Sequence, residues 1–193
     1  MTHPEHIIVL AGKTISLYTT LGLPPQAEPF PEKFVSSQEV LEPKELVNNL
    51  ADLLKKIGIT KATLLVLADD VIYQETFRPA ISNDTDPKVG AFLDKIPFER
   101  NKIVFRTLTG QGMTAIVATN RELSESVVHA IQKAGGSCIA TVPLLSYGKP
   151  FHTPLTADEQ HYLAGEMRIP KFAEILSPKK DSWYRGIAKL FKR

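Results

Sequence analysis

The stretch Leu64-Leu-Val-Leu-Ala-Asp-Asp-Val-Ile-Tyr-Gln-Glu-Thr-Phe77 decides the fold class, because it sets two strand-like runs beside each other. Its first run, residues 64–67, is continuously apolar, as in strands that are buried on both faces. The second run, residues 71–77, is rich in β-branched and aromatic residues. Asp69-Asp70 between them is typical of a turn. The stretch therefore predicts a hairpin built on one buried strand.

Three helices are predicted around this stretch from apolar spacing and end signals. Residues 43–57 begin at a proline and are followed by Gly58. Proline is common in the first turn of a helix, and glycine is common just past its end. Residues 87–96 follow Asp86, a capping residue. Thr119 and Glu122 form a capping-box pattern for a helix that ends at Gly135-Gly136.

Further strands alternate with these helices. Hairpins are predicted for residues 7–10 with 15–18 and for 103–108 with 113–118, and residues 137–142 form one more strand. Residues 22–31 hold four prolines and are predicted as loop. The order of elements predicts an α/β protein with mixed sheets and packed helices.

Composition sets the broad class. The chain has 193 residues, 43% of them hydrophobic, which is enough to bury a core, and its one cysteine, Cys138, excludes an internal disulfide framework. We expect a reducing, cytoplasmic compartment. A signal peptide and a membrane-spanning run are not predicted in the residues given.

Charge is divided unevenly along the chain. Residues 168–193 carry eight basic against two acidic residues, whereas residues 1–167 carry 15 basic against 19 acidic. An acidic body is unsuited to binding a phosphate backbone, so we expect no nucleic-acid partner.

No motif for catalysis, cofactor binding or metal binding is found. Gly12-Lys13-Thr14 lacks the upstream glycine of a phosphate-binding loop, and a strand rather than a helix is predicted after it. A buried thiol is expected at Cys138, and solvated side chains are expected at all five histidines: His3, His6, His129, His152 and His161. We therefore expect a protein that is not an enzyme.

Residues 5–145 resemble the actin-fold assembly proteins of type IV pili and type II secretion, the PilM family and the cytoplasmic part of the GspL family. Three segments carry the resemblance: Leu64–Phe77 above, Met113-Thr-Ala-Ile-Val-Ala-Thr-Asn-Arg-Glu122 and Ala134-Gly-Gly-Ser-Cys-Ile-Ala-Thr-Val-Pro143. The resemblance implies the first half of an actin-like, ribonuclease H-like fold with an inserted small α/β subdomain. Family members that bind ATP have an acidic turn after the first strand, where this chain has Leu10-Ala-Gly-Lys13.

The resemblance implies a non-catalytic scaffold that binds protein partners of a pilus or secretion platform at the inner face of the cytoplasmic membrane. We expect an extended partner peptide to bind between the first sheet and the unit of residues 71–142. Four parts are predicted: an actin-like first subdomain (1–67), the inserted subdomain (68–145), an irregular extension (146–181) and a basic amphipathic tail (182–193).

The tail combines aromatic, aliphatic and basic residues at helical spacing, as the cytoplasmic flank of a transmembrane helix does. Its marker residues are Trp183, Tyr184, Arg185, Ile187, Lys189, Leu190, Phe191, Lys192 and Arg193. Membrane-surface contact and packing of the tail on the body both fit this pattern.

Two other functions stay open. One is an actin or ribonuclease H-superfamily enzyme with Asp69, Asp70 and Glu75 around a nucleotide or divalent ion. The other is a small nucleic-acid-binding module, for which Phe105-Arg106 is the one hint.

Overall fold

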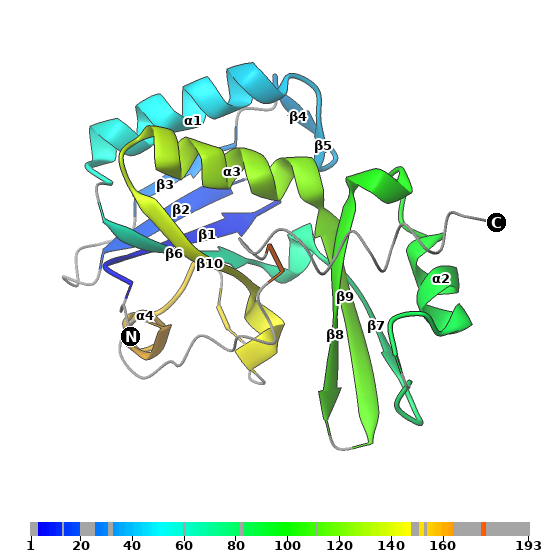
Figure 1. Cartoon of the computed structure of the whole chain (residues 1–193). Helices are drawn as coiled ribbons and strands as arrows, with labels where there is room; N and C mark the ends of the chain where they lie inside the picture. The colour runs from blue at the N-terminus through cyan, green and yellow to red at the C-terminus, as the bar shows by residue number, and fades with distance from the viewer. Residues whose placement is uncertain are drawn as a thin grey trace.

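A computed structural model describes residues 4–12, 14–19, 26–30, 33–59, 61–81, 83–110, 112–147, 151–152, 154–163 and 175–176. These residues form three sheets, of five, two and three strands, with helices packed around the two larger ones (Figure 1). The strands are β1 (His6–Ala11), β2 (Thr14–Thr19), β3 (Gln26–Pro29), β4 (Val35–Ser36), β5 (Glu39–Val40), β6 (Ala62–Leu67), β7 (Tyr73–Phe77), β8 (Ile103–Gly110), β9 (Met113–Asn120) and β10 (Ser137–Pro143). The helices are α1 (Pro43–Ile57), α2 (Pro87–Leu93), α3 (Arg121–Lys133) and α4 (Ala157–His161).

The larger sheet has the strand order β10-β6-β1-β2-β3. β6 runs parallel to both β1 and β10, and β1 is antiparallel to β2. Its central strands are apolar at successive positions because both faces are covered. Leu65 and Leu67 point to the face packed by α1 and α3, whereas Leu64 and Val66 point to the opposite face.

The smaller sheet has the order β7-β9-β8, and α2 covers one of its faces (Figure 1). The β8–β9 hairpin is in register from Ile103 opposite Asn120 to Gly110 opposite Met113. The other face of this sheet contributes Val104 and Val117 to the core cluster that α1, α3 and the larger sheet share. The two sheets therefore meet around a common core.

The predicted fold class is confirmed, since the chain is an α/β protein with a mixed larger sheet and packed helices. The local signals were also read correctly at several places. Pro43 begins α1 and Gly58 ends it in the left-handed conformation, and the Asp86 side chain accepts a hydrogen bond from the Lys88 N–H at the start of α2.

The hairpin predicted for residues 64–77 is wrong. Both edges of β6 are already hydrogen-bonded, to β1 on one side and to β10 on the other. A 3-10 turn, Asp69–Val71, carries the chain out of the larger sheet, and β7 pairs with β9 instead. A parallel strand between two neighbours has no edge left for a hairpin partner.

The predicted start of α3 is also wrong, by one residue. The cap is Asn120, whose side chain accepts a hydrogen bond from the Leu123 N–H at 3.2 Å. Thr119 still belongs to β9, and its hydroxyl donates to the carbonyl of Val71 at 2.8 Å. Strand pairing thus takes Thr119 away from the capping role that its spacing to Glu122 suggested.

Two further differences concern residues 22–31 and 137–143. Gln26–Pro29, predicted as loop, form the edge strand β3, where a terminal proline costs no sheet hydrogen bond. The strand Ser137–Pro143, assigned above to the inserted unit, pairs with β6 in the larger sheet.

Candidate functional site

The turn after β1 is held by an acidic side chain. The Asp70 carboxylate accepts a hydrogen bond from the Gly12 N–H at 2.9 Å, and a Cβ at position 12 would lie 3.1 Å from the same oxygen. Glycine is therefore the residue that fits this close approach. The N–H that a phosphate would need at this turn is already donated to a carboxylate.

The strand that follows this turn, β2, agrees with the prediction that Gly12-Lys13-Thr14 is no phosphate-binding loop. Lys13 itself lies outside the described residues.

The three carboxylates of the enzyme alternative do not form one metal-binding group. Asp69 and Asp70 are exposed in the 3-10 turn, and Asp70 holds Gly12. Glu75 lies on β7 and pairs with Lys95 at 3.0 Å. No group of three or more metal-binding side chains occurs among the residues that the structure describes.

An apolar core joins the two larger sheets. Here we define the sheet junction as the shared core between β10, β6 and β1 of the larger sheet and β8 and β9 of the smaller one. Five of its members are Leu10, Leu67, Val104, Val117 and Ile175. Leu108, Leu145 and Leu176 are partly buried against the same cluster. The junction is thus apolar, and a residue from the far end of the chain contributes to it.

Ile175 reaches the junction along the outer edge of β10. Its N–H donates to the carbonyl of Thr141 at 2.8 Å, and its side chain is 1% exposed. β6 occupies the other side of β10, so this carbonyl lies on the outer edge of β10, with which no other strand pairs among the described residues. In the view of Figure 1 the short red-brown segment of residues 175–176 lies between the sheets.

Hydrogen bonds to Glu159 hold together the segment around α4, which packs on the face of the larger sheet opposite α1 and α3. Glu159 accepts hydrogen bonds from the His152 N–H and ring nitrogen at 3.0 and 2.9 Å. It also accepts from the N–H and hydroxyl of Thr156 at 2.7 and 3.0 Å, which forms part of a capping box at the start of α4. Burial raises the pKa of Glu159, but these bonds outweigh it and hold the pKa at about 2.

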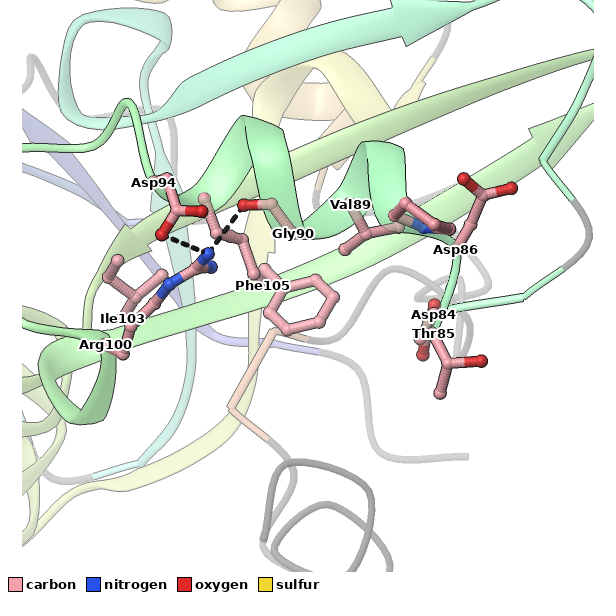
Figure 2. Close-up of a pocket in the computed structure, with 11 residues that line it drawn as sticks. Asp84, Thr85, Asp86, Val89, Gly90, Asp94, Arg100, Ile103 and Phe105 are labelled. Carbon is pink, nitrogen blue, oxygen red and sulfur yellow. Dashed lines mark hydrogen bonds and ion pairs between the residues drawn. The ribbon is translucent and has the colours of Figure 1, made fainter. Parts of the chain in front are cut away.

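A shallow cavity of about 320 Å³ lies between α2 and β8. Figure 2 shows Val89 and Phe105 in its middle, with Asp84, Thr85 and Asp86 towards one end and Asp94 with Arg100 towards the other. Arg100 donates to the carbonyl of Gly90 and to Asp94, each at 2.6 Å. These bonds join α2 to the segment before β8 at one end of the cavity.

The remaining predicted residues have ordinary environments. Phe105 is buried under α2, so it does not form the exposed aromatic platform that a nucleic-acid module needs. Cys138 is partly buried and donates to the carbonyl of Ala140 at 3.3 Å. The expectation for His6 is wrong: it lies in β1, and burial lowers its pKa. His129 and His161 are exposed.

Several predictions fall outside the described residues. They include His3, the irregular extension except residues at 146–147, 151–152, 154–163 and 175–176, and the whole tail of residues 182–193. Within the described part, no helix has the length and apolar content to cross a membrane.

Ile175 and Asp70 are the contacts that sequence reasoning missed. Ile175 stands in a proline-flanked stretch without periodicity, and nothing local marks it as buried. Asp70 was assigned to a hairpin turn, and its partner Gly12 is far away in the sequence.

No family model matches the sequence, and no curated protein matches it. Among solved structures, the chain is similar to the PilM–PilN type IV pilus biogenesis complex, with 16% identity and a TM-score of 0.47 over 69% of this chain and 45% of that chain. It is similar to the cytoplasmic domain of EpsL, an inner-membrane component of the type II secretion system of Vibrio cholerae, with 12% identity and a TM-score of 0.45 over 72% and 56%.

A third similar structure is a Bacteroides thetaiotaomicron protein with an actin-like ATPase fold and unknown function, with 11% identity and a TM-score of 0.41 over 69% and 51%. The chain spans about half of the length of these structures. The pilus and secretion proteins among these structures are of the kind that the sequence resembles, and at these identities the likeness is one of fold.

Proposed function

We propose that this chain is a non-catalytic docking module that binds a partner protein's segment at the sheet junction. The observation that carries the proposal is the outer edge of β10, where a segment from elsewhere hydrogen-bonds to Thr141 and buries an aliphatic side chain. A strand edge beside an apolar surface is a common site for peptide recognition, because backbone bonds supply affinity and side-chain pockets supply specificity.

The partner class follows from the sequence resemblance. We propose an assembly platform of the type IV pilus or type II secretion kind, with this chain acting at the inner face of the cytoplasmic membrane. The basic tail supports that location, since clustered Lys and Arg are attracted to anionic lipid by about 1 kcal/mol each. Co-sedimentation with anionic vesicles should fall when Arg185, Lys189, Lys192 and Arg193 are changed to Gln.

Binding is tested with labelled peptides that tile the cytoplasmic segments of pilus and secretion inner-membrane proteins, titrated with the full chain and followed by fluorescence anisotropy. We expect at least one peptide to bind and Leu108→Lys to weaken it, because Leu108 packs at the junction. Leu41→Lys is the matched control, since Leu41 is 53% exposed. Equal loss with both variants, or no binding by any peptide, contradicts the proposal.

The absence of ATPase function is tested separately by thermal denaturation with and without Mg-ATP. A ligand at a hundred times its Kd stabilises a protein by about 2.7 kcal/mol. We expect no shift, because the Gly12 N–H is held by Asp70. A clear shift would indicate a nucleotide site, which we would then place at the carboxyl ends of β1 and β6.

A further inference from the structure

The cavity between α2 and β8 has an apolar middle. Val89 and Leu93 of α2 and Ile103 and Phe105 of β8 line it, and each of them is buried. Its volume of about 320 Å³ lies at the lower end of the range of ligand pockets, roughly 300–1,000 Å³. The cavity is therefore of a size for one or two apolar side chains.

The ends of the cavity are charged, and acidic groups are in excess. Asp84 and Asp86 lie at one end, and at the other end Arg100 is paired with Asp94 (Figure 2). Three carboxylates against one guanidinium give the lining a net charge of −2. Asp84 and Asp86 each accept a hydrogen bond within the chain, and an ionised carboxylate has about four acceptor sites, so both can accept further bonds.

Gly90 leaves space beside the cavity. It lies within α2 and lines the cavity, and a Cβ at this position would meet no atom within 4 Å. Glycine in the interior of a helix is destabilising relative to alanine. The space at Gly90 lets the side chain of a ligand approach the backbone of α2.

The cavity thus fits a segment in which apolar and basic side chains lie close together. The tail, residues 182–193, has this chemistry and contains no acidic residue. Its larger apolar residues are Trp183, Ile187, Leu190 and Phe191, and its basic residues are Arg185, Lys189, Lys192 and Arg193. Basic side chains form charge-assisted hydrogen bonds with carboxylates, so the charges of the tail and the cavity are complementary.

The length of chain before the tail is sufficient to reach the cavity. Ile175 belongs to the same core cluster as Val104 of β8, and successive residues of a strand point to opposite faces, so Ile103 and Phe105 line the cavity on the other face. β8 is at one end of the strand order of its sheet. From Leu176 to Trp183 an extended chain spans up to about 25 Å. Layers packed on the two faces of one strand lie about 10 Å from it on each side, so this length reaches around β8.

We propose that the cavity between α2 and β8 is a binding site for the chain's own tail, which inserts an apolar side chain between α2 and β8 and places a basic side chain against Asp84 and Asp86. This inference goes beyond the proposed function, because it assigns a second site on the molecule. Anionic lipid would bind the same basic residues, so vesicles and the cavity compete for the tail.

The fluorescence of Trp183 tests the proposal in the full chain, because Trp183 is its one tryptophan. Gly90→Leu fills the space beside α2, and acrylamide should then quench Trp183 at least twofold more strongly than in the unchanged chain. Ala91→Leu is the matched control, since Ala91 is an exposed neighbour on α2 that does not line the cavity, and it should leave quenching unchanged.

A charge variant keeps the test independent of packing at Gly90. Asp84→Lys combined with Asp86→Asn makes one end of the cavity basic, and asparagine retains the cap of α2. This variant should also increase the quenching of Trp183, and circular dichroism checks that each variant is folded. Equal quenching of Trp183 in the unchanged chain and in both folded variants would overturn the inference.

Amide chemical shifts locate the tail. Changing Arg185, Lys189, Lys192 and Arg193 to Gln should shift the amide signals of residues 84–94, and shifts confined to other regions would overturn the inference. The same variant separates the two proposals. If its amide signals shift at the cavity and the unchanged chain does not bind anionic vesicles, the cavity site stands and the membrane location fails. If vesicles bind and these signals do not shift, the location stands and the cavity site fails.

Discussion

The two edges of the larger sheet are protected in different ways. β3 is short, its four residues are all exposed, and it contains Glu28 and ends at Pro29. β10 is mostly buried over its second half, and its edge carbonyl at Thr141 is taken by Ile175. Charge and proline make an edge unattractive to any strand, whereas a covering segment leaves the edge intact beneath it. The comparison teaches that β10 is protected by occupancy and β3 by composition.

The largest effect is expected from breaking the cover of β10. Ile175→Ala should lower the free energy of unfolding by about 2–4 kcal/mol, because it removes a fully buried aliphatic side chain and leaves a cavity. Urea denaturation measures the change. A loss below about 0.5 kcal/mol would mean that Ile175 is not packed as described.

A second substitution measures how much the segment on the opposite face of the larger sheet contributes to stability. Glu159→Gln should cost about 2 kcal/mol, because the carboxylate accepts four hydrogen bonds and bonds to a charged group are worth about 1.5–3 kcal/mol. Unlike Ile175→Ala, it should leave peptide binding at β10 unchanged. If Glu159→Gln lowered stability and also increased peptide binding, the segment held by Glu159 and the segment at β10 would not differ in their effect on binding.

The same carboxylate gives a pH dependence with a defined sign. The pKa of Glu159 is about 2 in the folded chain and 4.5 for an ordinary glutamate, so the folded state favours its charged form. Its stabilisation should be complete above about pH 5 and be lost as the pH falls through about 2. Urea midpoints between pH 6 and 3 should decline more steeply for the unchanged chain than for Glu159→Gln.

A third substitution removes the hydrogen bond between Asp70 and Gly12, which lies at the carboxyl ends of the central strands β1 and β6. Asp70→Ala should cost about 1 kcal/mol, because the released Gly12 N–H is at the surface and can bond to water. Thermal denaturation measures the loss. A cost above about 3 kcal/mol would indicate that Asp70 holds more than this turn.

The smallest change in stability is expected at β3. Pro29→Thr should alter the free energy of unfolding by less than about 0.5 kcal/mol, because the site is exposed. It restores an N–H at the edge and should increase self-association, measured by sedimentation velocity. A variant as monodisperse as the unchanged chain would show that composition elsewhere on β3 is sufficient protection.

Sequence patterns were most informative where the contacts are local. Pro43 and Gly58 bound α1, Asp86 caps α2, Thr156 and Glu159 form a capping box, and β8 pairs with β9 through a short turn. Each of these features lies within one short stretch of the chain. Backbone geometry alone therefore settles them.

The candidate site could not be found in this way. Its two defining contacts, Asp70 with Gly12 and Ile175 with Thr141, each join residues that are far apart along the chain. Neither Asp70 nor Ile175 carries a local signal for its partner. The sequence suggested the region between the sheets through a family resemblance, but not the residue that fills it.

By itself, the sequence determined the order of the main strands and helices, the α/β class and the ends of several helices, because these depend on periodicity and on short-range capping. Tertiary structure alone decided that β6 lies between β1 and β10, that Asn120 rather than Thr119 caps α3, and that Ile175 is buried in the core that the sheets share. Several strand edges and apolar surfaces of the chain could pair with or cover one another. Which of them do so depends on the packing of the whole core.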